Sequence, residues 1–400
     1  MKSEWTYRPL GELVSFASGG TPSKKRDDYW GGTIPWISAK TLKTENIDTS
    51  DLFITEEGLK AGSKIAPKGS ILLLTRGSGL FNGIPIARVE KDVAFNQDIK
   101  CLDSYGEVEN EFIFYWLLSQ KDYLMAKVGV TGIGAGKFDL DFLQKLMIPI
   151  PSEQERKSIV GFASSISEKI RCNAKVNDNL EQQAVALFKS WFVDFSLFGG
   201  TVPENWEDTT LENITTLITR GIAPKYSDNS DQTVVNQKCI RNHTIDLSLA
   251  RTHTPKAINE KWLKFGDLLI NSTGDGTLGR VAQVWFTPKA LTVDSHVTIV
   301  RPAREELIFY IGLWGILHEK EIESLHTGST GQTELPRDRV KMLKLLLPDD
   351  SSLSRFNSII APMASTIISN QEENQKLASL RDTLLPKLMS GEIDVSNIQL

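Results

Sequence analysis

Apolar and polar residues follow the same order twice along this chain. In the first half, the apolar runs at 71–74 and 84–89 predict two strands joined by the polar loop GSGLFNG. Residues 109–128 have a helical spacing that predicts an amphipathic helix, and a glycine-rich loop follows at 129–136. The second half predicts the same succession: a strand at 268–271, a loop at 272–279, a strand at 280–286, a helix near 304–325 and a loop at 327–332. Each half is therefore expected to form an α+β module.

The two halves are colinear copies of one plan. Trp5 and Pro22 of the first half have counterparts in Trp206 and Pro224, and the offset between such landmarks stays between 195 and 202 residues. A tandem repeat of this kind predicts two similar domains related by a pseudo-two-fold axis. Such symmetry suits a target that also has two halves, as duplex DNA does.

A long helix is predicted after each module. Apolar residues at a 3–4 spacing extend from Ile159 to Trp191, and their copy extends from Phe356 to Leu388. This heptad pattern is typical of a coiled coil, and ~33 helical residues form a rod of about 50 Å. Because the second copy contains a proline at 362 and another at 386, we expect that helix to begin late or to kink.

Two asparagines lie at the centre of each heptad pattern. Asparagine in a coiled-coil core costs stability and is tolerated best opposite another polar group, which fixes the register. Antiparallel packing pairs Asn173 with Asn374 and Asn177 with Asn370, and only this direction gives every pair the same sum of residue numbers. The alternative is that each helix packs on its own module with its asparagines in water.

The totals describe a globular protein of at least two domains, with 400 residues of which 40% are hydrophobic and 24% charged. Its three cysteines, Cys101, Cys172 and Cys239, lie far apart, which predicts a reducing compartment without disulfides or a zinc site. The N-terminus lacks the apolar stretch of a signal peptide, and no run reaches the ~18–20 apolar residues of a membrane span. We therefore expect a cytoplasmic protein.

The net charge of −5 is unusual for a protein that binds DNA, because phosphate contacts require basic residues. Local clusters of basic residues offset it. They lie at 24–26, at Lys40 and Lys43, and at Lys60, Lys64 and Lys68 with Arg76. Each cluster is either a phosphate-binding face or an ordinary solvated face.

The sequence lacks a motif for catalysis. GDGTLG at 274–279 has the glycines of a dinucleotide site, but a strand is predicted where that site needs a helix. TGIGAGK at 131–137 lacks the first glycine and the final hydroxyl of a phosphate-binding loop. HExxH, GxSxG and the paired prolines of amino-methyltransferases are absent, and all five histidines fall in the second half. We predict a chain that is not an enzyme and holds neither metal nor cofactor.

Both halves of the chain contain polar loops at corresponding positions, although neither contains a catalytic motif. The loop at 75–79 corresponds to 272–276, and each follows a buried strand, so the frame is kept while the polar side chains change. Arginine reads guanine, asparagine and glutamine read adenine, and lysines and hydroxyls hold phosphates. The candidate DNA-binding residues are Thr21, Ser23, Lys24, Lys25, Lys40, Thr75, Arg76, Ser78, Asn96, Gln97, Lys137, Lys225, Arg241, Asn271, Ser272, Thr273, Asp275, His296 and Gln332. The alternative for each is a turn-forming or capping role.

Several segments resemble the specificity subunits of type I restriction–modification systems, and the resemblance spans nearly the whole chain. The most specific are IPIPSEQERKSIV at 148–160 and LRDTLLPKLMSGEI at 380–393. WTYRPLGELVSFASGGTPSK at 5–24 and WISAK at 36–40 resemble the opening of the family's recognition domain. The second half departs from this pattern, with RGIAPKY in place of GGTPSK, which weakens the transfer of residue roles to it.

The resemblance implies an α+β fold with two target-recognition domains, at 1–150 and 199–350, separated by long antiparallel coiled-coil helices at 151–198 and 351–400. Each domain would read one half of a split, asymmetric site in double-stranded DNA. The helices would set the spacer and dock two methylation subunits. Those subunits would carry S-adenosylmethionine, and restriction subunits would use ATP and Mg²⁺. Two rival hypotheses stay open: a self-contained methyltransferase or nuclease, and a stand-alone DNA-binding or scaffold protein without these partners.

Overall fold

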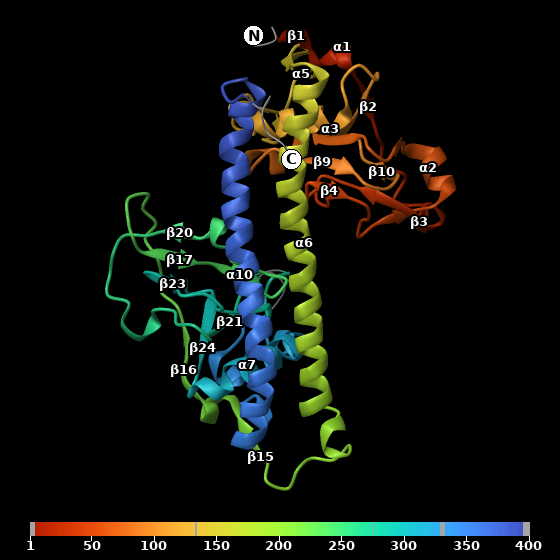
Figure 1. Ribbon diagram of the computed structural model, residues 1–400. Helices are drawn as coiled ribbons and strands as arrows, with labels where there is room; N and C mark the ends of the chain where they lie inside the picture. Colours follow the sequence, from red (N-terminus) through yellow and green to blue (C-terminus); the bar gives the residue numbers. More distant parts are fainter. Residues whose placement is uncertain (1–4, 133, 275, 329–332, 395–400) are drawn as a thin grey trace. The chain divides into compact units, whose positions relative to one another are not determined.

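The computed structural model describes residues 5–132, 134–274, 276–328 and 333–394 (Figure 1). The fold combines α-helices with β-sheets, and two helices, α6 (Glu153–Phe192) and α10 (Asp350–Met389), are 40 residues long each. In this described part, no helix has both the length and the apolar character that crossing a membrane requires.

The chain divides into two compact units. The first contains Met1–Arg171 together with Asn374–Leu400, and the second contains Cys172–Glu373. The division cuts through both long helices, so each unit consists of one α+β module and a part of α6 and of α10.

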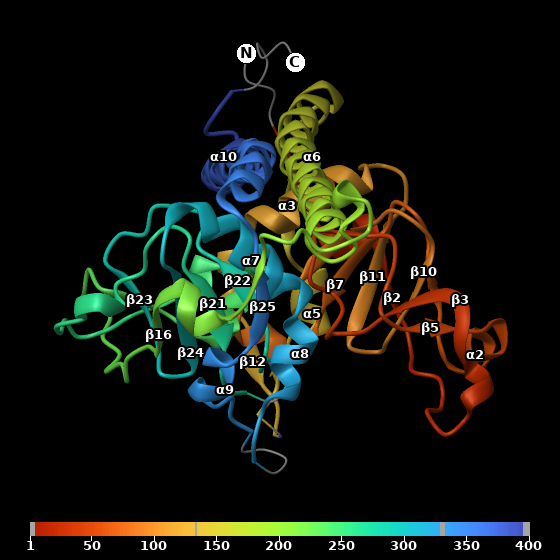
Figure 2. The same ribbon diagram turned by 90° about the horizontal axis from the view of Figure 1, so that it is seen from below.

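The first unit is built on several small sheets. Its central sheet has the strand order β2 (Val14–Ser18), β11 (Ile99–Ser104), β7 (Ile71–Leu74), β9 (Ile86–Val89) and β4 (Asn46–Ile47). Figure 2 labels the first three of these strands. The other sheets are β5 (Phe53–Ile54), β3 (Trp30–Ile37), β10 (Val93–Phe95) and β6 (Ile65–Ala66); β12 (Gly129–Val130), β13 (Gly136–Lys137) and β8 (Arg76–Gly77); and β1 (Thr6–Pro9) with β14 (Met147–Ile150). Short helices accompany them: α1 (Leu10–Leu13), α2 (Glu56–Gly62) and α5 (Leu140–Gln144). Since only Thr75 separates β7 from β8, the small sheet with β8 continues from the end of a central strand.

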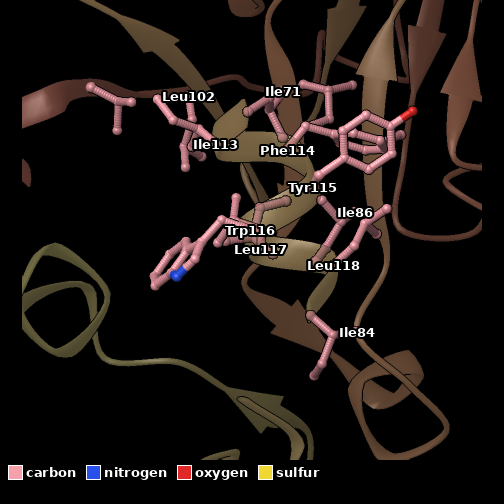
Figure 3. Packing of buried hydrophobic residues seen from close by; sticks show 14 of the residues in the cluster. Ile71, Ile84, Ile86, Leu102, Ile113, Phe114, Tyr115, Trp116, Leu117 and Leu118 are labelled. Carbon is pink, nitrogen blue, oxygen red and sulfur yellow. The ribbon is translucent and has the colours of Figure 1, made fainter. Parts of the chain in front are cut away.

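Helix α3 (Asn110–Ser119) forms the centre of this unit's core. Its residues from Phe112 to Leu118 are all buried, and the helix packs beside Ile71 and Ile86 of the central sheet (Figure 3). A helix that is apolar on all sides belongs inside a protein, so the prediction of an amphipathic helix is wrong for this segment. The predicted helix is also interrupted at Gln120, after which α4 (Lys121–Met125) begins.

The second unit repeats this arrangement. Its main sheet has the order β16 (Thr215–Arg220), β24 (Val297–Pro302), β21 (Leu268–Asn271) and β22 (Val281–Gln283). Around it lie β20 (Arg251–Thr252), β17 (Thr233–Val235) and β23 (Leu291–Val293); the hairpin of β18 (Ile240–Arg241) and β19 (Thr244–Ile245); β15 (Glu207–Thr210) with β25 (Lys344–Leu347); and the helices α7 (Ile308–Leu317), α8 (Glu319–Ser324) and α9 (Arg337–Lys341). By their order, β24, β21 and β22 correspond to β11, β7 and β9, and α7 corresponds to α3.

Different caps begin the two long helices. The Ser152 hydroxyl accepts a hydrogen bond from the Glu155 amide at 3.3 Å, and the Glu155 carboxylate accepts one from the Ser152 amide at 3.0 Å, which forms a capping box for α6. Before α10, the Asp349 carboxylate accepts hydrogen bonds from the Trp206 indole at 2.8 Å and the Ser352 hydroxyl at 2.7 Å. Desolvation raises the pKa of Asp349, but these hydrogen bonds outweigh it and lower the pKa to about 2.

The prediction of a late start for the second long helix is wrong. Helix α10 is continuous from Asp350, although Pro362 lies inside it. Leu353, Phe356 and Ile360 precede the proline and are fully buried in the core of the second unit. This tertiary packing stabilises the first turns, which outweighs the hydrogen bond that Pro362 cannot donate.

Within each unit, the parts of α6 and α10 run in opposite directions. In the second unit, the side-chain amide of Asn370 donates to Oδ1 of Asn177 at 2.8 Å, and the ring centroids of Trp191 and Phe356 lie 5.5 Å apart. Both contacts agree with the antiparallel register expected from the sequence. Asn173 donates to the Glu373 carboxylate at 2.7 Å.

The first unit contains the other ends of these helices. Asn374 donates to the carbonyl oxygen of Ile170 at 3.3 Å. Further along, Ile159 and Ala163 of α6 belong to the same buried cluster as Leu388 of α10. Asn177 also donates to the carbonyl oxygen of Ile367 at 3.4 Å, so three of the four central asparagines hydrogen-bond to a backbone carbonyl or a carboxylate of the opposite helix.

Candidate nucleic-acid interface

Four candidate DNA-binding residues line one cavity in the first unit. The cavity has a volume of about 280 Å³ and lies where β7 continues into β8. We call it the β8–β13 cavity, and its lining consists of Thr75, Arg76, Gln97, Lys100, Lys137, Phe138, Asp139, Leu140 and Leu143. The fold thus brings together residues that were expected, from three distant segments of the sequence, to contact DNA.

Backbone hydrogen bonds fix the shape of the cavity. The amides of Thr75 and Arg76 both donate to the carbonyl oxygen of Asp98, at 2.9 and 3.2 Å. The Phe138 amide donates to the carbonyl oxygen of Thr75 at 2.9 Å. In the antiparallel pair of β8 and β13, Lys137 lies directly opposite Arg76.

The cavity is lined by three cations and one carboxylate. Arg76 and Lys137 are exposed and lie opposite each other, an arrangement in which like charges repel. The carboxylate of Asp139 accepts a hydrogen bond from the Asp141 amide at 3.0 Å and caps α5. Lys100, the third cation, is hydrogen-bonded to the hydroxyl of Ser18 on β2, within the central sheet. An anionic ligand would relieve the repulsion, and the phosphates of a nucleic acid are such a ligand.

Two further loops lie beside the cavity. The Thr21 hydroxyl donates to Oε1 of Gln97 at 2.7 Å, which attaches the loop at 19–26. A Cβ atom at Gly77 would lie 3.9 Å from that of Ala39, which places the 38–41 loop next to β8. The remaining exposed candidates of this unit lie on these two loops or directly after β8: Ser23, Lys24, Lys25, Lys40 and Ser78.

Asn96, by contrast, forms a turn. Its side chain is 6% exposed, its Oδ1 accepts a hydrogen bond from the Asp98 amide at 3.2 Å, and its Nδ2 donates to the Asp98 carboxylate at 3.3 Å. This local pattern is an Asx turn. The turn-forming alternative therefore describes Asn96 better than contact with a base.

The second unit has the same backbone frame at the equivalent place. The Ser272 amide donates to the carbonyl oxygen of His296 at 2.8 Å, and the Leu335 amide donates to the carbonyl oxygen of Ser272 at 2.8 Å. Thr273 and Glu334 form an antiparallel bridge. These are the contacts that Thr75 and its neighbours make around the β8–β13 cavity.

The side chains on this second frame carry different charges. Oγ1 of Thr273, which takes the place of Arg76, lies 2.7 Å from Nδ1 of His296. Glu334 takes the place of Lys137 and forms an ion pair with Arg220 at 2.6 Å. The frame presents a hydroxyl, an imidazole and a paired carboxylate where the first unit presents two cations. The two modules therefore suit different chemical patterns in a ligand.

Comparison with known proteins shows which proteins the chain is similar to. Residues 2–182 match the model of the type I restriction modification DNA specificity domain. This part of the chain is therefore similar to the DNA specificity domains of type I restriction–modification systems. The chain is 27% identical over 427 residues to the type I restriction enzyme MjaIX specificity subunit of Methanocaldococcus jannaschii, a match that covers 99% of this chain and 95% of the relative.

Other specificity subunits of type I systems are similar to part or all of the chain. The EcoR124I/EcoR124II specificity subunit of Escherichia coli is 31% identical over 161 residues, which is 40% of each chain. The crystal structure of the type I restriction–modification system S subunit from M. genitalium has a TM-score of 0.55 and 17% identity, and covers 96% of both chains. The latter similarity shows that the two proteins share a fold.

Two candidates in the second unit are buried. Asn271 is fully buried and donates to the carbonyl oxygen of Gln237 at 3.0 Å, and Ser272 is fully buried with its hydroxyl 2.6 Å from that of Thr298. Both side chains are therefore part of the interior that holds the frame, and a ligand at the surface would not reach them. Lys225 and Arg241 are exposed on other loops of the unit. Asp275 and Gln332 lie outside the described residues.

Sequence reasoning missed four residues of these sites. Lys100 lines the β8–β13 cavity, and Gln237 lies 3.2 Å from Oγ1 of Thr273. Arg220 and Glu334 form the ion pair of the second frame. A charged residue between two buried apolar ones, as Lys100 is between Ile99 and Cys101 in β11, was the available signal. Among the described residues, no group of three or more His, Cys, Asp or Glu is placed to hold a metal ion.

Proposed function

We propose that each module of this chain reads one half of a bipartite, asymmetric site in double-stranded DNA. One observation carries the proposal: the frame around the β8–β13 cavity recurs around Thr273, but the side chains upon it differ in charge. Base pairs differ in the donors and acceptors they present, so two half-sites of different sequence require two different sets of side chains on one scaffold. Arg76 suits guanine, while Lys137 and Lys100 suit phosphates.

We propose further that the modules form a pseudo-two-fold pair held by an antiparallel coiled coil of α6 and α10. The sequence repeat and the opposite directions of the two helices within each unit support this arrangement. A 40-residue helix is about 60 Å long, which exceeds the ~34–36 Å of one DNA turn. The helices would then set the number of unread base pairs between the half-sites.

The chemistry of restriction and modification would reside in partner subunits. In this proposal α6 and α10 dock two methylation subunits, which carry S-adenosylmethionine, and restriction subunits use ATP and Mg²⁺. This chain would be non-catalytic and would bind no cofactor of its own. The absence of catalytic motifs from the sequence and the relatives' names as specificity subunits support this division.

Mapping methylated adenines in a genome tests the proposal. Cells would express the methylation subunits with the wild-type chain, with Arg76→Ala, or with His296→Ala. We expect Arg76→Ala to relax one position in one half of the methylated site, because a bidentate contact is worth about 1–3 kcal/mol of discrimination. We expect His296→Ala to change only the other half.

Lys91→Ala is the matched control, because it removes an exposed cation of the first unit outside the cavity. Its methylated sites should be those of the wild type. If Arg76→Ala and His296→Ala alter the same half-site, or if neither alters any position, the assignment of one half to each module is wrong.

A further inference from the structure

An ionic triad attaches the first module to α10, away from the β8–β13 cavity. The Arg381 guanidinium is only 8% exposed and makes two hydrogen bonds with the Glu45 carboxylate, at 2.6 and 3.2 Å. Glu45 lies directly before β4 and also pairs with the Lys121 ammonium, at 3.1 Å, at the start of α4. From the helix outward, the charges of this triad are positive, negative and positive.

A second triad attaches the other module to α6. Nδ1 of His243 lies 2.5 Å from the carboxylate of Glu181 on α6, and its Nε2 lies 3.5 Å from the carboxylate of Glu319 at the start of α8. Hydrogen bonds to Glu181 and Glu319 raise the pKa of His243 to about 9. The ring is therefore protonated at neutral pH, and the charges from the helix outward are negative, positive and negative.

The module residues of the two triads occupy equivalent places in the repeated fold. Glu45 directly precedes β4, which pairs in parallel with β9, and His243 forms a parallel bridge to Ala282 of β22, the counterpart of β9. Lys121 and Glu319 are the first residues of the short helices that follow α3 and α7. At each of these two places, the residue of one module carries the opposite charge to its counterpart in the other. The long helices also carry opposite charges there, Arg381 on α10 and Glu181 on α6.

We propose that these triads are docking contacts of opposite polarity, which fix the long helix on which each module sits. The first module, placed on α6 in the second unit, would set Glu45 against Glu181. The second module, placed on α10 in the first unit, would set His243 against Arg381. Each exchange brings like charges together at a partly buried contact, and such juxtaposition opposes wrong pairing.

The backbone at His243 supports a positioning role. Asn242 and His243 have φ values of +47° and +57°, in the left-handed region that few residues other than glycine adopt. They form the two-residue turn between β18 and β19, a turn type that needs two such residues. This turn directs the imidazole towards Glu181. The inference goes beyond DNA reading; only its consequence, a fixed order of the two half-sites, rests on the function proposed above.

Inverting the first triad in the full chain tests the proposal. The variants are Arg381→Glu, Glu45→Arg and Lys121→Glu, made singly and all together, and the readouts are the thermal midpoint and hydrogen exchange of amides in β4 and α4. Breaking a hydrogen-bonded charge pair should speed that exchange by about 10- to 100-fold in each of the first two variants. The triple variant carries the polarity of the second triad and should return to within about threefold of the wild type.

Lys376→Glu is the matched control, since it reverses an exposed charge on the same part of α10. It should leave both readouts unchanged. If Arg381→Glu alone yields no folded protein, recovery of folded protein in the triple variant becomes the readout. A triple variant no better than the worst single variant overturns the proposal, because loss of packing alone cannot be restored by inverted charges. Since no DNA is involved, the outcome is independent of the DNA-reading function.

Discussion

Replacing Lys137 with alanine removes one cation from the β8–β13 cavity and should reduce the salt dependence of DNA binding. Each phosphate contact contributes about −0.9 to the slope of log K against log salt for duplex DNA. A fourfold rise in salt therefore weakens binding by about 3.5-fold for each contact. The affinity of Lys137→Ala for DNA should therefore fall about 3.5-fold less than that of the wild type over the same fourfold rise in salt. The loss should be similar on cognate and unrelated DNA, because a phosphate contact carries no sequence information.

Arg76→Ala separates phosphate contact from base contact at the same cavity. If Arg76 reads a base, its loss should cost about 1–3 kcal/mol on the cognate site and much less on unrelated DNA. The assay is a competition titration of the intact chain, with the methylation subunits proposed above, from about 50 to 200 mM salt. Lys91→Ala serves as the control for loss of an exposed charge. An unchanged slope for Lys137→Ala, or an equal change for Lys91→Ala, would refute the assignment of the cavity to DNA.

Three further predictions concern the helices, a titrating group and the core. Inserting four residues after Asn177 should lengthen the unread spacer without changing the bases read; methylation mapping would contradict this by finding new half-sites at the old spacing. The pKa of His243 is raised from 6.5 to about 9, chiefly by its hydrogen bonds to Glu181 and Glu319, so its stabilisation should be complete below pH 6.5 and disappear as pH rises through 9. A thermal midpoint with the same pH dependence in His243→Ala would disprove this. Phe112→Ala should cost about 3–5 kcal/mol in urea unfolding, because the ring is fully buried; a cost below about 1 kcal/mol would mean that the core collapses around the cavity.

Local sequence predicted those elements that local forces determine. The strands at 71–74 and 268–271 have the predicted bounds, because four consecutive buried residues follow a turn in each case. The bounds of helices depended on tertiary structure instead. Buried residues near the start of α10 outweigh Pro362, and the interruption at Gln120 lies inside a segment whose spacing alone predicts one continuous helix.

The sequence predicted several residues of the candidate site but not how the fold brings them together. Thr75, Arg76, Gln97 and Lys137 were named from repeated loops, and the cavity contains all four. Their association depends on the pairing of β8 with β13, two short strands from distant parts of the chain, which no local pattern specifies. For the same reason sequence reasoning did not place Lys100 at this cavity. Polarity alone also cannot separate an exposed side chain from a buried one, which is why Asn96 and the two buried candidates of the second unit were included.

The repeated frame explains how two copies of one module can come to differ in ligand without losing their fold. Thr75 and Ser272 are buried, and their backbone groups make the same hydrogen bonds in both units. The side chains carried above them differ, as Arg76 and Thr273 do, and exposed substitutions of this kind usually change stability by no more than about 0.5 kcal/mol. Contacts between a module and its long helix have no such freedom, because reversing one charge there opposes the partner charge. The preferred bases can therefore diverge while the frame is kept, whereas an exchange of the modules between the helices meets an electrostatic barrier.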